Sequence, residues 1–329
     1  MEPQYIGIDL HKAFFQACAV SASGLRLWEA RFDRTAAGLQ AFAARGVATA
    51  HIAVEATAPT WTFVDAVQPL SARVCVVDTR KTRLKAGFAA KTDRLDARRL
   101  ADALRRESVV SIYIPPPAIR ELREICRGRH HLVRVRAKLM QTIRALLLRQ
   151  DAGDPPVTRL VSARGLAWLK QLDLGGDTQG ILRRLIHALE AIDEEATAAD
   201  AVVRVRAASD PIAPALQTLV GIGPVVALTV RAEIGTIERF PHWRQLASYA
   251  GLVPRVEASG GRVRTGAITG EGSPWLRWAL VEAAIHAMNR RDPVGRWARR
   301  LATRKGILKA RVALARQLCH DVMQVWPTP

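Results

Sequence analysis

The sequence lacks the features of a disulfide-bonded or membrane-spanning protein. Its four cysteines are scattered and none forms a C-x-x-C pair, and its first residues show no charged-then-apolar leader. The one long stretch without charge, residues 211–230, contains Pro211, Pro214, Pro224, Gly221 and Gly223 and is therefore a poor membrane helix. We expect a reduced, cytoplasmic, nucleoid-associated bacterial protein with no membrane partner.

Acidic residues are also in short supply. The chain has 30 Asp and Glu against 49 Lys and Arg, which gives a formal charge of +19 at pH 7 and a sequence pI near 11.0. Such a charge indicates a polyanionic partner, and the predominance of arginine favours nucleic acid over an anionic membrane surface. The hydrophobic content of 49% over 329 residues is that of a globular protein with two or three domains.

The N-terminal part, residues 1–115, has the pattern of an α/β domain. Apolar runs predict strands at residues 5–9, 14–20, 25–32, 51–55 and 73–78. Helices are predicted to begin at Thr35, near Pro59 and at Thr92. Three strands in a meander, followed by alternating helices and strands, are the element order of an RNase H-like fold.

Residues 116–210 are predicted to form a helical spacer. In the run 118–149, Leu132, Leu139 and Leu146 recur every seven residues, which predicts a helical hairpin or coiled coil. A second helical run, residues 181–208, carries an acidic patch, and we expect the two runs to pack antiparallel.

The first of these runs is strongly basic, and a second basic stretch covers residues 290–316. A charge run is most often a solvated face. Two such runs in a chain of this net charge favour contact with phosphate. The candidate nucleic-acid-binding residues of the first run are Arg127, Arg129, Arg134 and Arg136.

The C-terminal part, residues 211–329, reads as a mostly α-helical domain. The segment Leu219–Pro224, Leu-Val-Gly-Ile-Gly-Pro, has the look of a helix-hairpin-helix, in which the backbone N–H groups around Gly221 and Gly223 would bind a DNA phosphate. An ordinary Gly-Pro turn between core helices explains the same residues equally well.

Four carboxylates lie at places where a metal site can form. Asp9 and Glu55 end two apolar strands, and Asp93 and Asp96 lie on one face at the start of a helix. Taken singly, each has an ordinary explanation as a turn, cap or helix-start residue. Together, four carboxylates can hold two divalent cations, and hard oxygen ligands indicate Mg²⁺ or Mn²⁺.

The ordered motifs of the chain resemble those of the DEDD transposases of the IS110 insertion-sequence family. Tyr-Ile-Gly-Ile-Asp9-Leu-His-Lys, Val-Glu55-Ala-Thr and Lys-Thr-Asp93-Arg-Leu-Asp96-Ala look like the three acidic motifs of that family. The C-terminal half continues the resemblance, with Gly-Ile-Gly-Pro224, Ala-Glu-Ile-Gly235, residues 246–254 and Ser259-Gly260. One departure is Ala58, where the glutamate motif commonly has glycine. The resemblance implies a catalytic domain similar to RuvC-type Holliday-junction resolvases, with a metal site at Asp9, Glu55, Asp93 and Asp96.

The same resemblance implies that Ser259 is a nucleophile that joins transiently to a DNA phosphate. The surrounding Arg255, Arg262 and Arg264 have the charge to stabilise the transition state. From the residues alone, Ser-Gly-Gly is an ordinary hairpin turn. Ser273, the other serine of this region, precedes a proline and is predicted to begin a helix.

We therefore expect a DNA transposase or recombinase that cuts and exchanges the strands of an insertion sequence. The family resemblance implies a structured RNA encoded by the element as a guide, and a dimer or tetramer that handles four strands. Two alternatives stay open: a RuvC-like, structure-selective nuclease that works by hydrolysis, and an inactive nucleic-acid binder. An actin-like ATPase also begins with a Gly-Ile-Asp strand, but the chain lacks downstream Gly-rich phosphate loops.

Overall fold

The computed structural model describes residues 3–78, 82, 92–259 and 262–327. The chain forms two compact units, Met1–Ile114 and Pro115–Pro329. In the part of the chain that the structure describes, no helix combines the length and the apolar character needed to cross a membrane.

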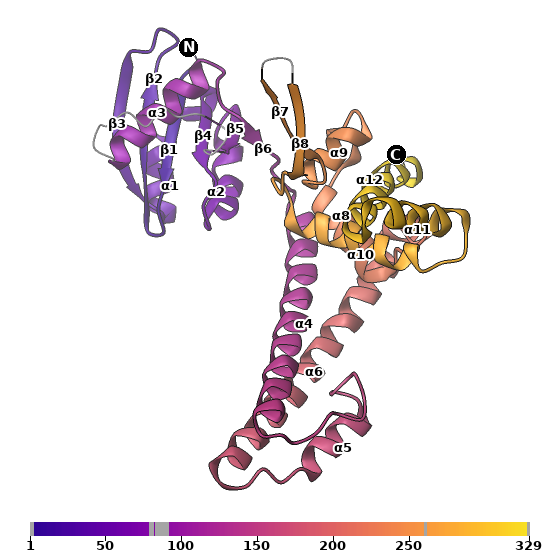
Figure 1. The fold of residues 1–329 in the computed structure, drawn as a ribbon. Helices are drawn as coiled ribbons and strands as arrows, with labels where there is room; N and C mark the ends of the chain where they lie inside the picture. Colours follow the sequence, from indigo (N-terminus) through magenta and orange to yellow (C-terminus); the bar gives the residue numbers. More distant parts are fainter. Residues whose placement is uncertain (1–2, 79–81, 83–91, 260–261, 328–329) are drawn as a thin grey trace. The chain divides into compact units, whose positions relative to one another are not determined.

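The first unit is built on one sheet with the strand order β3-β2-β1-β4-β5-β6 (Figure 1). Its strands are β1 (Tyr5–Leu10), β2 (Phe14–Val20), β3 (Arg26–Asp33), β4 (His51–Glu55), β5 (Arg73–Val77) and β6 (Ser111–Ile112). Strands β1, β2 and β3 pair antiparallel, β4 joins β1 parallel, β5 joins β4 parallel, and the short β6 closes the edge antiparallel. The first five strands confirm the sequence predictions to within one residue at each end, whereas β6 was not expected.

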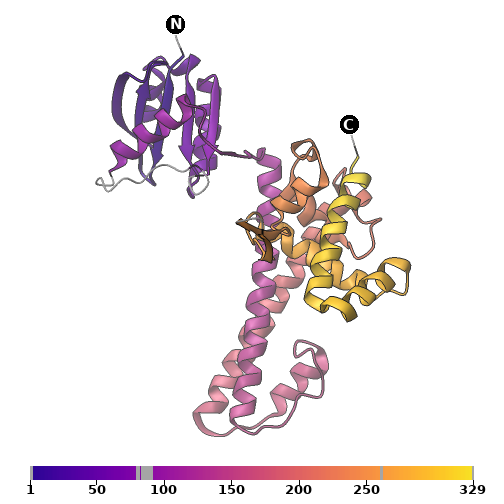
Figure 2. The same cartoon turned by 45° about the horizontal axis from the view of Figure 1, so that its top comes forward.

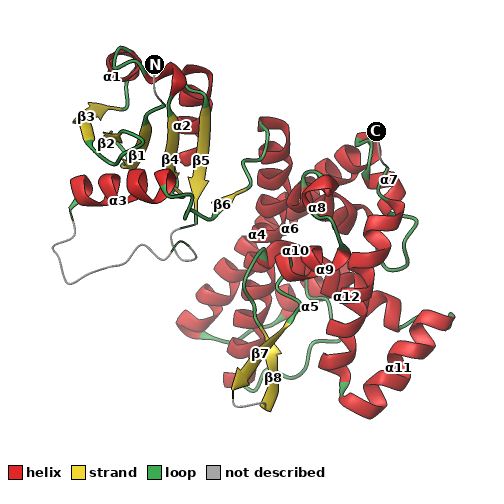
Figure 3. Ribbon diagram, turned by 90° about the horizontal axis from the view of Figure 1, so that it is seen from above, coloured by secondary structure: helices red, strands yellow, loops and turns green. Residues whose placement is uncertain are grey.

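Helices cover both faces of this sheet (Figure 3). They are α1 (Ala36–Ala43), α2 (Thr60–Val67) and α3 (Asp93–Arg105), with 3-10 turns at Val47–Thr49 and Gln68–Leu70. Alternate residues of β1 such as Ile6 and Ile8 share a buried cluster with Phe42 of α1 and Phe63 of α2. The opposite face packs on α3, so the N-terminal unit is an α/β/α sandwich. The mixed α/β class is therefore confirmed.

The two threonines at which helices were predicted to begin are both N-caps in the structure. The Thr35 hydroxyl accepts a hydrogen bond from the Gly38 N–H at 3.2 Å, and the Thr92 hydroxyl accepts one from the Leu95 N–H at 3.3 Å. A β-region threonine that satisfies an otherwise unpaired N–H fixes the first turn of a helix. The start of α3, which carries Asp93, is therefore set locally by sequence.

Gly7 decides how closely α3 approaches the sheet. A Cβ atom at Gly7 would lie 2.0 Å from the Ala97 carbonyl oxygen and 2.4 Å from the Ala101 nitrogen. Both are backbone atoms of α3, so a side chain at this position would fit only if the whole helix moved away from β1. The absence of a side chain at Gly7 therefore allows α3 to pack directly on β1.

We expect Gly7→Ala to destabilise the first unit by about 1–3 kcal/mol or more, because overpacking displaces α3. Gly128→Ala is the matched control, since Gly128 is an exposed position in a helix with nothing within 4 Å of its added Cβ. That variant should gain about 0.5–1 kcal/mol from helix propensity. Denaturant unfolding of the full chain measures both changes, and an unaltered midpoint for Gly7→Ala would contradict the close packing.

Two long helices, α4 (Pro117–Arg149) and α6 (Gly176–Ser209), form an antiparallel hairpin in the second unit (Figures 1 and 2). Cys126 near the start of α4 shares a buried cluster with Val203 near the end of α6. At the other end, Leu146 packs with Leu182. The short helix α5 (Ala163–Gln171) lies between them in the chain and was not predicted. The two expected helical runs and their antiparallel packing are confirmed.

The rest of the second unit is mostly helical and shares one large buried cluster with the hairpin. Its helices are α7 (Ala213–Leu216), α8 (Pro224–Ile234), α9 (Trp243–Tyr249), α10 (Pro274–Met288), α11 (Pro293–Lys305) and α12 (Ile307–Val325), with a 3-10 turn at Ile237–Arg239. A hairpin of β7 (Pro254–Ser259) and β8 (Arg262–Ile268) interrupts them. The division of this unit into a spacer, 116–210, and a C-terminal domain, 211–329, stays a prediction.

Candidate functional site

Asp9 lies at the carboxyl end of β1, on the face of the sheet that packs against α3. Side chains alternate along a strand, so Asp9 points to the same side as Gly7, the residue that contacts α3. Its side chain is only 15% exposed. The chain thus places a carboxylate at the rim of the buried layer, between β1 and the first turn of α3.

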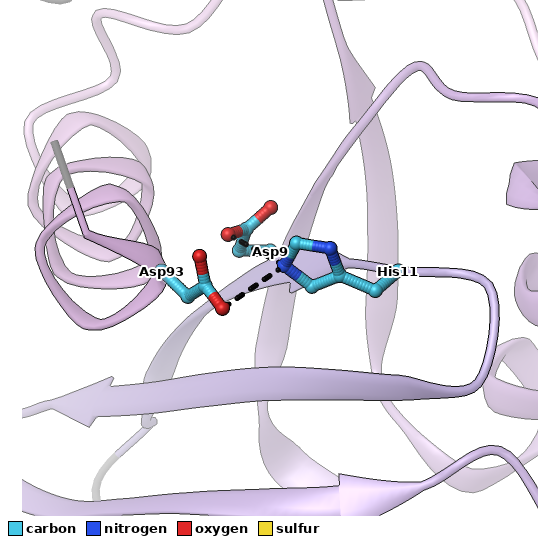
Figure 4. A group of neighbouring side chains, drawn as sticks. All are labelled: Asp9, His11 and Asp93. Atoms are coloured by element: carbon cyan, nitrogen blue, oxygen red, sulfur yellow. Dashed lines mark hydrogen bonds and ion pairs between the residues drawn. The ribbon is translucent and has the colours of Figure 1, made fainter.

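Asp93 and Asp96 both lie in the first turn of α3. Favourable interaction with the helix dipole explains acidic residues at this place in part. The Asp96 carboxylate also pairs with Arg99 at 3.2 Å, whereas Asp93 is half exposed and approaches the same His11 nitrogen as Asp9 does (Figure 4). Of the two, Asp93 is therefore the one that converges with Asp9 directly.

His11 is the residue that sequence reasoning missed. Its Nε2 atom lies 3.2 Å from Asp9 Oδ2 and 3.2 Å from Asp93 Oδ2 (Figure 4). Among the described residues, Asp9, His11 and Asp93 form a group whose potential ligand atoms all lie within 4.8 Å of one another. The signal in the sequence was the i, i+2 spacing of Asp9 and His11 at a strand end, which puts two side chains on one face.

The electrostatics of Asp9 link the three aspartates. Burial raises the pKa of Asp9, the neighbouring His11 opposes that rise, and the carboxylates of Asp93 and then Asp96 add to it. Like charges raise a carboxyl pKa only when they lie close by. Asp96 therefore belongs to the same electrostatic neighbourhood, although its carboxylate is not in the compact group.

Glu55 ends β4, the parallel neighbour of β1. The parallel register pairs Ile8 with Val54. Asp9 and Glu55 are the next residues on the two strands, so they occupy equivalent positions. Ala53, two residues before Glu55, packs in a cluster with Leu100 of α3. Glu55 is thus on the α3 side of the sheet, at the same edge as Asp9, although it lies outside the compact group in the described chain.

Gln16 is a second polar residue that was not singled out. It is paired in register with Asp9 on the antiparallel neighbour β2, and it is buried with 6% exposure. Cys18, two residues further, packs against α3, so Gln16 faces the same side as Asp9. A single polar residue within the apolar strand Phe14–Val20 was the available signal.

Ser259 lies in the second unit, at the end of β7. Its Cα partner across the hairpin is Arg262, and Glu257 is paired with Arg264. The hairpin that the residues alone suggested is therefore present, with Gly260 and Gly261 outside the described residues. Arg255, at the base of β7, is exposed. Ser259 thus lies at the outer end of a two-stranded ribbon.

Ser273 has a structural role. Its hydroxyl accepts a hydrogen bond from the Leu276 N–H at 3.2 Å and so caps α10, which confirms the predicted helix start. It also donates to Glu233 Oε2 at 2.9 Å. Glu233 is a buried carboxylate, and Arg127 of α4 binds its other oxygen at 2.8 and 3.1 Å.

The candidate nucleic-acid-binding arginines of α4 are largely engaged inside the second unit. Besides the Arg127 pair with Glu233, Arg129 pairs with Asp200 at 2.6 Å and Arg136 with Asp193 at 2.6 Å. Both acidic partners come from α6. Arg129 and Arg136 therefore hold the hairpin together, and phosphate contact through these arginines stays a prediction. Arg134 is exposed and forms no ion pair with another residue that the structure describes.

The two glycines of the Leu219–Pro224 turn have different environments. Gly221 has φ +87° and packs on α10, where an added Cβ would lie 2.3 Å from the Ala283 carbonyl oxygen. Gly223 is the N-cap of α8 and has open space beside it. An open groove of about 510 Å³ lies along residues 217–223, and His286 and Arg290 complete its lining. The turn therefore combines a packing role at Gly221 with an accessible helix start at Gly223.

Comparison with known proteins covers both units. A model of the DEDD transposases of the IS110 type, described as "Transposase", matches residues 6–150. A second model, "Transposase IS116/IS110/IS902 family", matches residues 213–299. The first match contains all four predicted carboxylates, and the second contains Ser259.

Individual relatives agree with these matches. The "Transposase for insertion sequence element IS1111A" of Coxiella burnetii is 26% identical over 324 residues, which cover 94% of this chain and 86% of that protein. The "Probable family 20 transposase" of Pseudomonas aeruginosa is 28% identical over 68% of this chain and 69% of its own length. The "Transposase for insertion sequence element IS1328" of Yersinia enterocolitica is 26% identical over 87% of this chain and 84% of its own.

An α/β unit with an acidic sheet edge, joined to a helical unit that matches a transposase model, defines an enzyme of the DNA transposase class. More specifically, the chain belongs to the IS110/IS116 family of DEDD transposases. Membership implies DNA as the substrate and the use of a divalent metal ion.

Proposed function

We propose that this transposase cuts and exchanges DNA strands with a metal site at Asp9, Asp93, Asp96 and Glu55. The observation that carries this proposal is the convergence of Asp9 and Asp93 on one point at the carboxyl edge of the sheet, each with an oxygen 3.2 Å from the same His11 nitrogen. Carboxylates this close repel each other unless a cation lies between them.

The donor set fits a hard divalent cation. Carboxylate oxygens from Asp9, Asp93 and their neighbours are the ligands that Mg²⁺ and Mn²⁺ prefer. When bound, such an ion activates the attacking oxygen and stabilises the leaving oxygen in phosphodiester chemistry. Asp96, which lies close enough to affect Asp9, and Glu55, on the adjacent strand, would complete the site.

The topology of the first unit supports an RNase H/RuvC-like fold. Three antiparallel strands followed by two parallel ones, in the order β3-β2-β1-β4-β5, place the ends of β1 and β4 side by side. In open α/β sheets, ligands bind outside the carboxyl ends of adjacent strands. Asp9 and Glu55 occupy those two ends.

Ser259 is proposed as the nucleophile. Its Oγ would attack a DNA phosphorus, form a phosphoserine ester and release a DNA hydroxyl, while the hydroxyl proton passes to a base. A DNA hydroxyl would later attack the same phosphorus and release the serine, so the number of phosphodiester bonds is conserved. Arg255, and Arg262 and Arg264 of the paired strand β8, would supply the positive charge that this transition state needs.

Nucleic acid is proposed to bind along the basic helices and the Gly221–Gly223 turn. The groove beside that turn presents the start of α8 together with His286 and Arg290, which suits a DNA phosphate in the manner of a helix-hairpin-helix. A structured RNA would share these surfaces, and a dimer or tetramer would handle four strands. The charge of +19 supports the binding of polyanions such as DNA and RNA.

Arg134→Gln tests the role of the basic hairpin. If Arg134 contacts phosphate, its loss should weaken binding on any sequence and reduce the slope of log K against log salt by about one unit. Arg129→Gln is the comparison variant, because it leaves Asp200 without its 2.6 Å partner and should mainly lower stability. An unchanged slope in the salt titration of Arg134→Gln would mean that the Arg134 side chain is solvated and does not contact phosphate.

The experiment that tests the proposed function is recombination between a donor and a target plasmid by purified protein, metal ion and element-derived RNA. Joined strands are expected. Cleavage that yields only separated ends would favour the hydrolytic, structure-selective nuclease. Binding with no cleavage under any metal would favour the inactive nucleic-acid binder.

A further inference from the structure

One ring nitrogen of His11 points toward both carboxylates that converge at the sheet edge (Figure 4). We propose that His11 is itself a ligand of the metal ion, so that the site in the first unit contains a nitrogen donor in addition to its carboxylates. This inference rests on the proposed metal site and adds a residue that the four-carboxylate motif does not contain.

The distances suit coordination. Two ligands at right angles on an ion with bonds of about 2.0–2.1 Å lie about 3 Å apart. The Nε2 atom of His11 is 3.2 Å from Asp9 Oδ2 and 3.2 Å from Asp93 Oδ2. A cation would therefore fit among the three atoms with only small movements of the side chains.

The position of His11 is fixed by the turn between β1 and β2. The His11 N–H donates to the Phe14 carbonyl at 2.9 Å, and Arg34 donates to the carbonyls of His11 and Lys12 at 3.5 and 2.8 Å. The imidazole stacks on the Phe14 ring with centroids 4.4 Å apart and planes at 25°. Backbone and ring are thus oriented by groups other than the carboxylates, as expected of a preorganised ligand.

The competing explanation is that His11 is only a cation that pairs with the two carboxylates and leaves when metal binds. The two roles differ in their effect on metal preference. Imidazole nitrogen favours transition metals such as Mn²⁺ over Mg²⁺, whereas an ion pair with no bond to the metal has no such preference.

The test is electron spin echo spectroscopy of Mn²⁺ bound to the full chain, prepared with either ¹⁴N- or ¹⁵N-labelled histidine. A histidine nitrogen coupling that changes with the label is expected in the wild type. It should disappear in His11→Gln and persist in His51→Gln. His51 is the matched control because it lies in the same unit but at the other end of the sheet, where it pairs in register with Tyr5.

Competition binding provides the second readout. His11→Gln should lower Mn²⁺ affinity by about tenfold or more and Mg²⁺ affinity by clearly less. Equal losses for the two ions, or Mn²⁺ bound without any histidine coupling, would overturn nitrogen ligation while leaving the carboxylate site intact. If Mn²⁺ binding does not depend on Asp9 at all, the proposed metal site itself is wrong.

Discussion

The Asp9→Asn protein is expected to bind DNA normally and to lose strand cleavage by a factor of at least about 10²–10³, the usual effect of removing one preorganised group that stabilises a transition state. Asp9 is more enclosed than Asp93 and Asp96, with 15% of its side chain exposed against 50% and 24%. The amide keeps the shape of the side chain but removes the charge that a metal ion needs. Cleavage of labelled DNA in Mg²⁺ or Mn²⁺ measures the loss.

A stability measurement separates this effect from unfolding. Burial and the neighbouring carboxylates raise the pKa of Asp9. Asp9 therefore stabilises the fold when it is protonated, and this contribution to the free energy of unfolding is lost as pH rises through the raised pKa. At neutral pH without metal, Asp9→Asn should therefore melt no lower than the wild type. Added Mn²⁺ should raise the melting temperature of the wild type and leave that of the variant unchanged.

Asp102→Asn is the matched control for Asp9→Asn. Asp102 lies on α3, pairs with Arg105 at 3.6 Å and is two turns from the acidic group. It should retain cleavage and its metal-dependent rise in melting temperature. Full cleavage by Asp9→Asn would contradict the metal-site assignment.

The second large effect is expected at Ser259. A serine nucleophile retains the energy of the broken phosphodiester in a protein–DNA ester, so that a strand can be rejoined elsewhere without an external energy source. Ser259→Ala should therefore bind metal and DNA but form neither a covalent adduct nor exchanged strands. Denaturing electrophoresis on labelled DNA detects the adduct directly.

Two serines in the same unit serve as controls with different expectations. Ser248 is exposed on α9, and Ser248→Ala should be neutral. Ser273→Ala should retain the chemistry but lower stability by about 1–3 kcal/mol, because it removes the cap of α10 and the hydrogen bond to buried Glu233. A covalent complex formed by Ser259→Ala would place the nucleophile elsewhere.

Local patterns predicted much of the fold. Alternating apolar residues located the five main strands, and threonine caps located the starts of α1 and α3, because both signals depend on residues adjacent in the chain. The leucine spacing likewise predicted the long helix α4, and a second helical run with an acidic patch predicted α6. The short strand β6 and helix α5 carry too few residues for a periodic signal, and both were missed.

The parts of the site that depend on contacts between distant segments were not predictable in the same way. His11 gains its significance only when α3 brings Asp93 to within 3.2 Å of it, and that approach depends on the missing side chain of Gly7. Similarly, the sequence predicted phosphate contacts for Arg129 and Arg136. In the structure, the packing of α4 against α6 pairs them with Asp200 and Asp193. The partners of such pairs are far apart in the sequence and meet only through tertiary packing, so no local pattern predicts them.

The most direct test of the account is one denaturing gel of DNA incubated with wild type, Asp9→Asn and Ser259→Ala in the presence of Mg²⁺ or Mn²⁺. The account predicts a covalent protein–DNA adduct for the wild type alone, and its absence for both variants although each still binds DNA. Efficient cutting by the wild type with no adduct at any time point, or an adduct that persists in Ser259→Ala, would contradict it.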